Sequence, residues 1–220
     1  MPQIASLHNA AAIFHARIAE DLFEKGWSVQ SDYLGIGLAA LLKARMAALE
    51  EKDALTPAGI GRDSQNRIAE DIRRDRTFWL DPADAADAAY TGLMEDLRLT
   101  LNKNLFLGLF EYEAHYALYP KGGFYKKHID ALKGGKNRLV STVCYLNDDW
   151  REKDGGMLTL FDRHDHSRVV DVVLPEEGSI AVFLSEDIPH EVTPANRTRR
   201  SIAGWFRCNS SSAERADPLV

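Results

Sequence analysis

Cysteine is scarce in this chain, which has only Cys144 and Cys208 among its 220 residues. Two thiols cannot build a disulfide framework, and neither lies in a CxxC motif of the kind that binds zinc. The composition therefore favours a reducing compartment, and we expect a cytoplasmic protein.

Long apolar runs and an excess of positive charge are also missing. The longest apolar run covers positions 35–42, far short of the ~20 residues that a membrane span needs. Segment 1–23 lacks a basic region followed by an unbroken apolar stretch, so no secretory signal is expected. With 27 Lys and Arg against 33 Asp and Glu, the formal charge is −6. We therefore predict no general nucleic-acid surface and no membrane partner.

Helical periodicity dominates the chain up to about residue 105. Apolar residues recur every three or four positions in 9–25 and in 36–51, which predicts two amphipathic helices. A third helix should begin after Asp81, a capping residue followed by Pro82, and run toward Leu105. The residues expected to share a face are Ile13, Phe14, Ile18, Leu22 and Phe23 in the first helix and Ile36, Leu38, Leu41, Leu42, Met46 and Leu49 in the second.

A segment at about 52–80 interrupts the helical pattern. It is rich in Gly, Arg and Asp, and loops of this length inside a compact domain are usually functional or disordered. We expect a lid-like loop that ends in a short strand at Thr77–Leu80. Either its arginines form a solvated face, or together with Trp79 they hold an extended acidic peptide. These arginines are Arg62, Arg67, Arg73, Arg74 and Arg76.

Short strands separated by turn signals make up the rest of the chain. The expected strands cover 111–119, 124–130, 139–146, 157–161, 169–174, 179–184 and 200–207. Many short, evenly spaced strands predict a sandwich or barrel, with the early helices packed on one face. We interpret 1–220 as a single domain in which 1–104 gives helical support and 105–209 forms the β core.

One local motif in the strand-rich part has the residue types of a metal site. In His128-Ile129-Asp130 the imidazole and the carboxylate are two residues apart, so on a strand they share a face and can reach one ion. His190, after the apolar strand SIAVFL, supplies a third ligand. Two histidines and one carboxylate leave three metal positions open, which is typical of non-haem Fe(II) and dioxygen chemistry.

A basic residue beyond His190 strengthens this interpretation. Arg199 begins an apolar strand and has no acidic neighbour in the sequence. An unpaired interior charge is costly, and the far carboxylate of a dicarboxylate co-substrate would pair with the planar guanidinium. A cupin-like zinc or binding protein would have little use for this arginine. The next residue, Arg200, should point to the opposite face of the strand.

Other conspicuous residues carry weaker hypotheses. His164 and His166 form a rival HxH pair, but their polar neighbours predict an exposed turn. His8 and His15 are expected on the surface of the first helix, and His115 is expected to be packed or solvated rather than catalytic. Cys144 should be a small core residue.

Four segments match a known family in order: ALYPKGGFYKKHID, RLVSTVCYLNDDW, DGGMLTLF and PHEVTPANRTR, with IRRDRTFWL preceding them. From Tyr112 to Arg207 the chain resembles the 2-oxoglutarate/Fe(II)-dependent dioxygenases. It is most similar to their prolyl hydroxylase-domain branch, which includes the hypoxia-factor prolyl hydroxylases and their bacterial relatives. The resemblance implies an α+β, mainly β fold, with a double-stranded β-helix (jelly-roll) core and N-terminal supporting helices.

The resemblance also implies roles for individual residues. His128, Asp130 and His190 would be the catalytic iron ligands. The 2-oxoglutarate site would comprise Arg199 on the 5-carboxylate, Tyr145 sharing that carboxylate, and Tyr119 lining the pocket. Residues near the substrate would be Arg138, Asp75, Trp79 and the inward aromatic Trp205. Two departures from the animal enzymes bear on substrate detail: the Tyr119–His128 loop is one residue shorter, and Ala203 replaces a threonine.

The implied activity is hydroxylation of a prolyl residue in a protein. Fe(II) would be the cofactor, O₂ and 2-oxoglutarate the co-substrates, and succinate and CO₂ the co-products. Ascorbate is a candidate reductant, and bacterial members of the branch suggest a translational elongation factor as one substrate. Two alternatives stay open. One is hydroxylation of another residue, a free amino acid or a small molecule; the other is a catalytically silent fold that senses oxygen, iron or 2-oxoglutarate.

Overall fold

The computed structural model describes residues 2–60, 67–69, 71–130 and 137–208. Its helices are α1 (Pro2–Glu24), α2 (Gly35–Glu51) and α3 (Ala85–Leu105), with a short 3₁₀ turn at Glu152–Asp154. The strands before α3 are β1 (Trp27–Gln30), β2 (Thr56–Pro57), β3 (Gly59–Ile60), β4 (Arg67–Ile68) and β5 (Arg76–Trp79). The strands after α3 are β6 (Leu109–Tyr119), β7 (Tyr125–His128), β8 (Arg138–Tyr145), β9 (Leu158–Phe161), β10 (Val169–Val173), β11 (Ile180–Leu184), β12 (His190–Val192) and β13 (Arg199–Cys208). None of the described helices combines the length and the apolar character needed to cross a membrane.

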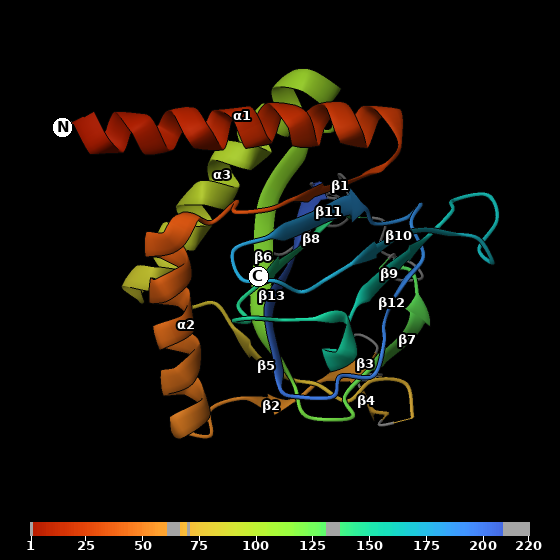
Figure 1. Ribbon diagram of the computed structural model, residues 1–220. Coiled ribbons are helices and arrows are strands. Elements are labelled where there is room, and N and C mark those ends of the chain that lie inside the picture. The colour runs from red at the N-terminus through yellow and green to blue at the C-terminus, as the bar shows by residue number, and fades with distance from the viewer. Residues whose placement is uncertain (1, 61–66, 70, 131–136, 209–220) are drawn as a thin grey trace, which may run out of the picture.

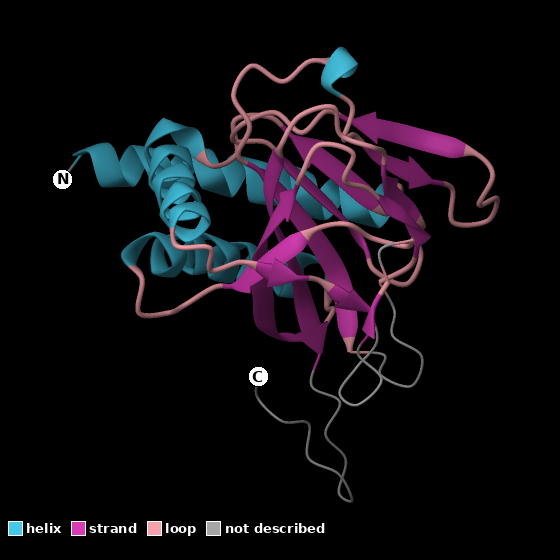
Figure 2. Cartoon of the chain, turned by 90° about the horizontal axis from the view of Figure 1, so that it is seen from below, coloured by secondary structure: helices cyan, strands magenta, loops and turns pink. Residues whose placement is uncertain are grey.

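Two antiparallel sheets form the body of the molecule (Figure 1). In the described residues the larger sheet has the strand order β1-β11-β8-β13-β6-β5-β2, and the smaller has the order β10-β9-β12-β7. Strands β3 and β4 pair with each other. The helices gather on one side of the strands, as Figure 2 shows from below. The predicted jelly-roll core with a helical support is confirmed.

The N-terminal part contributes more than helical support. Strand β1 pairs with β11, with Trp27 opposite Phe183, and so forms one edge of the larger sheet. Strand β5 pairs with β6 and carries β2 on its other side, which forms the opposite edge. The expected strand at 77–80 therefore exists as β5, while β1 was not predicted, because four residues between two helices give too short a pattern.

Alternation along the strands separates two apolar cores. On β11, Ile180 and Val182 belong to the cluster that packs against the helices, whereas Ala181 and Phe183 belong to the cluster between the two sheets. Successive side chains of a strand point to opposite faces, so one strand serves both cores. The helix-side cluster is the larger, and it fixes the sheet on which the inner residues stand.

Three details of the helices differ from the sequence prediction. Helix α3 begins at Ala85, because the Asp84 side chain accepts hydrogen bonds from the backbone N–H groups of Ala86 and Asp87. The predicted helix faces are wrong at four positions whose side chains are exposed: Ile13, Phe23, Ile36 and Leu41. His15 is buried, and its Nε2 lies 2.9 Å from the hydroxyl of Tyr33. A polar partner from a distant segment, which periodicity does not show, explains that burial.

Candidate active site

Three side chains that could bind a metal converge between the two sheets. His128 ends β7 and is paired in register with His190, the first residue of β12. Nε2 of His128 lies 3.5 Å from Oδ1 of Asp130, and Nε2 of His190 lies 3.7 Å from Oδ2 of the same carboxylate. All three ligand atoms lie within 4.8 Å of one another. The structure thus brings together the three residues that the sequence proposed.

The convergence has a different local cause from the one predicted. Strand β7 ends at His128, and Asp130 lies in the bend that follows it rather than on the strand. The carboxylate therefore reaches the histidines because the chain turns, not because residues i and i+2 of a strand share a face. The expected strand at 124–130 is correspondingly shorter at its end.

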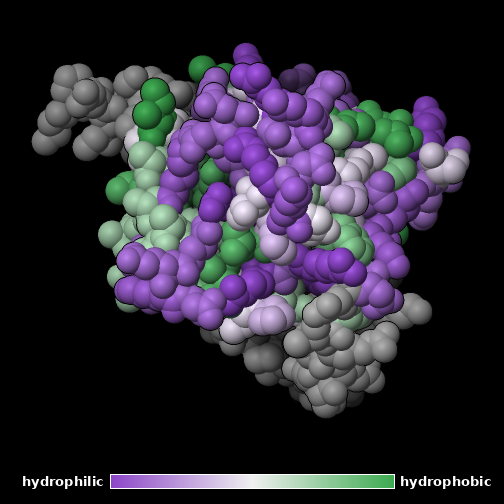
Figure 3. Space-filling model, turned by 60° about the horizontal axis from the view of Figure 1, so that its bottom comes forward, coloured by the Kyte–Doolittle hydropathy of each residue, from purple (hydrophilic) through white to green (hydrophobic). Residues whose placement is uncertain are grey.

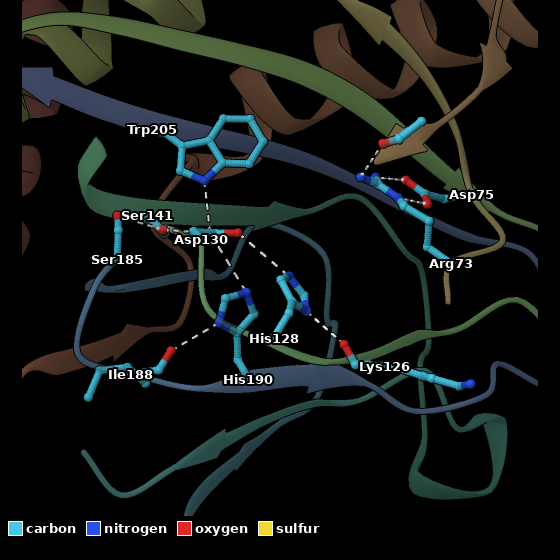
Figure 4. Close-up of polar contacts among 11 residues, drawn as sticks. Arg73, Asp75, Lys126, His128, Asp130, Ser141, Ser185, Ile188, His190 and Trp205 are labelled. Atoms are coloured by element: carbon cyan, nitrogen blue, oxygen red, sulfur yellow. Dashed lines mark hydrogen bonds and ion pairs between the residues drawn. The ribbon is translucent and has the colours of Figure 1, made fainter. Parts of the chain in front are cut away.

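Backbone carbonyl groups fix both imidazole rings. Nδ1 of His128 lies 2.7 Å from the carbonyl oxygen of Lys126, and Nδ1 of His190 lies 3.1 Å from that of Ile188 (Figure 4). A carbonyl oxygen only accepts, so each Nδ1 donates, and this contact orients each ring with its Nε2 toward the position of a metal. Burial, and then the neighbouring His128, lowers the pKa of His190 to about 4. His190 is therefore a neutral ligand at physiological pH.

Two donors hold the carboxylate of Asp130. The Ser141 hydroxyl and the Trp205 indole N–H both donate to Oδ2, at 2.7 and 2.8 Å, from the side away from the histidines (Figure 4). Burial alone would raise the pKa of Asp130, but His190, His128 and the Ser141 hydroxyl hold that pKa well below its usual range. The carboxylate is therefore ionised and oriented before any ligand binds.

The donor set fits one divalent ion. Metal–ligand bonds of about 2.1 Å place neighbouring ligand atoms about 3–4 Å apart, and the measured separations need little adjustment. Two imidazoles and one carboxylate on one side of an ion are typical of non-haem Fe(II). The exposed pair His164 and His166 belongs to no group of potential ligands in the described residues.

A buried arginine lies behind the metal ligands. Arg199, on β13, is 1% exposed, and no carboxylate of the described residues lies within ion-pair distance of it. Its Nε donates to the carbonyl oxygen of Gly156 at 2.8 Å, and Nη1 donates to the Ser201 hydroxyl at 3.0 Å. Gly156 has a φ of +64°, and a Cβ there would lie 3.0 Å from the Arg199 side chain. Glycine is therefore the residue that this contact requires.

Two buried polar atoms, one of Arg199 and one of Tyr145, show which kind of group this end of the cavity fits. Nη2 of Arg199 and the Tyr145 hydroxyl have no hydrogen-bond partner among the described residues. The guanidinium lies 4.9 Å from the Tyr119 ring and 5.1 Å from the Tyr145 ring. Burial raises the pKa of both tyrosines, so both hydroxyls stay protonated. Unsatisfied buried donors are costly, and a carboxylate would accept from both donors at once. The site therefore fits the far end of 2-oxoglutarate.

A cavity of about 740 Å³ joins these groups to the surface. The buried residues Arg199, Tyr119 and Phe183 line it, and so do the three potential metal ligands. Residues 56–59, which lie at the bottom of Figure 1, also line it. That side of the molecule comes forward in Figure 3, where hydrophilic residues dominate. A substrate therefore approaches through a polar surface to a buried metal position.

The expected entrance residues take different positions. Trp79 is 50% exposed and, with Arg138 and Trp205, lines the cavity. The Arg138 guanidinium lies 3.8 Å from the centre of the Trp205 ring, and its Nε donates to Glu113 at 2.7 Å. Asp75 is not a lining residue, because it is buried behind Arg73 and accepts from its Nε at 2.7 Å. Of the expected entrance residues, Asp75 is the one that the structure places off the wall.

The arginines of the 52–80 segment are largely partnered inside the protein. Arg73 pairs with Asp75, Arg76 pairs with Asp53, and Arg74 stacks over Phe124. Arg62 and the side chain of Arg67 lie outside the described residues. The described arginines therefore do not form a set of unpaired cations waiting for an acidic peptide.

Several site residues escaped the sequence analysis. Ser141 and Ser201 hold Asp130 and Arg199, while Glu113 and His115 line the cavity. Strand alternation could have predicted the two serines, because Ser141 shares a face with Tyr145 and Ser201 shares a face with Arg199. By the same rule Arg200 should face outward, and it does, since it pairs with Glu50 of α2.

Comparisons with known proteins agree with this geometry. A family described as the 2OG-Fe(II) oxygenase superfamily matches residues 114–207. The crystal structure of a Pseudomonas putida prolyl-4-hydroxylase is 39% identical, covers 88% of this chain and 98% of its own, and superposes with a TM-score of 0.78. A Trichoplax adhaerens prolyl hydroxylase, solved with a peptide fragment of the hypoxia inducible factor oxygen degradation domain, is 22% identical, with 94% and 93% coverage and a TM-score of 0.78. At that identity it supports the fold alone.

Curated sequences include animal relatives. Human Egl nine homolog 1 is 29% identical over 82% of this chain and 43% of its own length. The chain spans about half the length of Egl nine homolog 1: 43% of the human, 55% of the rat and 46% of the mouse protein. The similarity therefore concerns the part of those proteins that this chain matches.

Proposed function

The chain belongs to the 2OG-Fe(II) oxygenase superfamily and is of the prolyl hydroxylase type, and from this premise we propose that it hydroxylates a prolyl residue in a protein substrate. The reaction would consume O₂ and 2-oxoglutarate and release succinate and CO₂, with one oxygen atom in the hydroxyl group and the other in succinate. The observation that supports this most is the unpartnered pair of Arg199 Nη2 and the Tyr145 hydroxyl beside the three metal ligands.

Bound Fe(II) would supply the oxidative chemistry that couples 2-oxoglutarate decarboxylation to insertion of oxygen into a C–H bond. The chain's own residues do the positioning. His128, Asp130 and His190 would hold the ion, while Arg199 and the Tyr145 hydroxyl bind the far carboxylate of the co-substrate. Ser141 and Trp205 keep the Asp130 carboxylate turned toward the ion. Phe183 and Leu158 make part of the cavity wall apolar.

Similarity supports a prolyl substrate more than geometry does. The Pseudomonas putida relative at 39% identity is a prolyl-4-hydroxylase, and the animal relatives include prolyl hydroxylases. The cavity opens to the surface beside Trp79 and Arg138, where an extended peptide could enter. A translational elongation factor, suggested by the resemblance to the bacterial members, is the first protein to assay. Hydroxylation of another residue, a free amino acid or a small molecule is the alternative outcome.

The test uses the purified chain with Fe(II), 2-oxoglutarate and O₂, with and without ascorbate. Proline-containing peptides and whole candidate proteins are incubated and searched by mass spectrometry for one added oxygen on proline, and succinate is measured in parallel. We expect hydroxyproline and succinate in equal amounts, lost in His190→Ala and kept in His166→Ala, whose histidine is on an exposed turn. Oxygen only on other residues or on free amino acids would overturn the prolyl assignment, and no succinate with any substrate would favour a silent sensor.

A further inference from the structure

His115 lies on the cavity wall and has no role in the binding of metal or co-substrate described above. On β6 it pairs in register with Ala203 on one side and Trp79 on the other. Its ring lies edge-on to Trp79, with centroids 5.2 Å apart, and tilted against Trp205 at 5.4 Å. The side chain is 6% exposed, yet it lines the cavity. Two tryptophans thus hold this imidazole in one orientation at the wall.

The hydrogen bonding of this ring leaves one nitrogen for a ligand. Nδ1 lies 3.1 Å from the carbonyl oxygen of Tyr116, and a carbonyl oxygen only accepts, so Nδ1 carries the proton. Burial lowers the pKa of His115 to about 4, so the ring is neutral at physiological pH. Nε2 is therefore a hydrogen-bond acceptor, and no group among the described residues donates to it.

The surroundings of Nε2 favour a neutral donor over a charged one. The charged side chains nearby are already paired: Arg138 with Glu113, Arg207 with Glu111, and Arg73 with Asp75. Small residues, Ala117 and Ala203, line the neighbouring wall and leave room for a chain to approach. A neutral acceptor on the wall of a cavity is suited to a polar but uncharged group of a substrate.

We propose that His115 is a specificity-determining residue whose Nε2 accepts a hydrogen bond from a backbone N–H of the peptide substrate, on a residue next to the target proline. Proline itself has no backbone N–H, so the donor must come from a flanking residue. A peptide N–H drawn into the cavity without a partner would be penalised, and His115 removes that penalty. This proposal rests on the proposed function, because it needs a peptide whose proline is hydroxylated.

A matched pair of variants separates substrate binding from support of the wall. In His115→Asn the amide N–H can still donate to the Tyr116 carbonyl, but nothing replaces Nε2. In His115→Gln an amide oxygen can reach the position of Nε2, while the Nδ1 contact is lost. We expect His115→Asn to raise the peptide KM about tenfold and His115→Gln to stay within about threefold of the unaltered protein. A structural role for His115 predicts the reverse order.

A peptide series tests the partner of Nε2 directly. Each amide that flanks the target proline is replaced in turn by an ester, which removes one N–H. We expect one ester position to raise KM about tenfold with the unaltered protein and to have little further effect with His115→Asn. Melting temperature, 2-oxoglutarate KM and Mn(II) affinity serve as folding and site controls and should not change. If His115→Asn does not fold, His115→Phe, which keeps a ring between the two tryptophans but has no acceptor, replaces it in the ester series, and an ester effect that persists in this variant overturns the role of His115.

The outcomes separate the two proposals. If the unaltered protein hydroxylates no proline-containing peptide, the proposed function fails and the role of His115 falls with it. If it hydroxylates proline but no single ester raises the peptide KM, only the role of His115 is overturned. The same holds if the changes in KM caused by the His115 variant and by each ester are independent of each other. If one ester raises the peptide KM with the unaltered protein but not with the His115 variant, both the proposed function and the role of His115 are supported.

Discussion

The two faces of strand β13 have different surroundings: one lines the cavity, and the other packs against the helices. Arg199, Ser201 and Trp205 face the cavity, where polar groups hold ligand positions. Ile202 and Phe206, on the same strand, are fully buried in the apolar cluster against the helices. A few ångströms of backbone separate a face built for chemistry from a face built for stability. Substitutions on the two faces should therefore fail in different ways.

The largest effect is expected on the cavity side, at Asp130. Replacing Asp130 by Asn removes the anionic ligand while the side chain keeps its size. We expect turnover of 2-oxoglutarate to fall at least about a thousandfold, because the metal loses its charged ligand. Steady-state succinate release measures this, with circular dichroism as the folding control. Retention of more than a tenth of the activity would mean that Asp130 is not a ligand.

A comparable loss of stability, without a change of chemistry, is expected on the helix face. Phe206→Ala removes a fully buried ring that packs 4.6 Å from the ring of Tyr112. Such truncations cost about 3–5 kcal/mol of unfolding free energy. Urea denaturation measures that loss, while the 2-oxoglutarate KM of the folded fraction should stay the same. A changed KM with unchanged stability would erase the distinction between the two faces.

Adjacent arginines give the sharpest pair. Arg199→Met removes the guanidinium beside Tyr145, and we expect the 2-oxoglutarate KM to rise about a hundredfold, because a charge-assisted bidentate contact is lost. Arg200→Met removes only the partly exposed pair with Glu50, which contributes about 0–1 kcal/mol. Its KM should be unchanged. Equal KM values for the two variants would show that the co-substrate does not bind at Arg199.

Trp205 tests the support of the metal ligand. Trp205→Phe keeps an aromatic ring against Arg138 but removes the N–H that donates to Asp130. Loss of such an outer contact lowers metal affinity about 10–100-fold. Calorimetric titration with Mn(II) measures it, and Trp79→Phe, on the half-exposed entrance, is the matched control. An unchanged affinity in Trp205→Phe would show that the contact does not orient Asp130.

The smallest effect is expected far from the cavity, at His15. Burial lowers the pKa of His15 below its ordinary value of 6.5, so the folded protein binds this proton less readily than the unfolded chain. The corresponding stability is complete above pH 6.5 and is lost as pH falls through and below that value, with a slope of at most about 1.4 kcal/mol per pH unit. His15→Gln should flatten the pH dependence of the unfolding free energy between about pH 5 and about pH 7, because the unfolded chain no longer takes up a proton at this position in that range. His166→Gln, on an exposed turn, should not.

The metal ligands and Arg199 could be predicted from the sequence, because few kinds of site use these residue types in this order. The bend that brings Asp130 to the histidines and the Asp84 cap of α3 could not be predicted from the sequence, since both depend on contacts of particular backbone atoms. His15 was misplaced for a similar reason: its partner Tyr33 lies on another segment. The family resemblance placed Asp75 near the substrate, and a resemblance between sequences does not show that Arg73 covers this carboxylate.

Anaerobic calorimetry tests the central claim most directly, that one cavity holds a metal ion on three side chains and a dicarboxylate behind it. Fe(II) is titrated first and 2-oxoglutarate second. We predict one ion per chain, lost in His190→Ala, followed by one 2-oxoglutarate, lost in Arg199→Met and kept in Arg200→Met. Saturable Fe(II) binding that survives His190→Ala, or 2-oxoglutarate binding that ignores Arg199, would contradict the account.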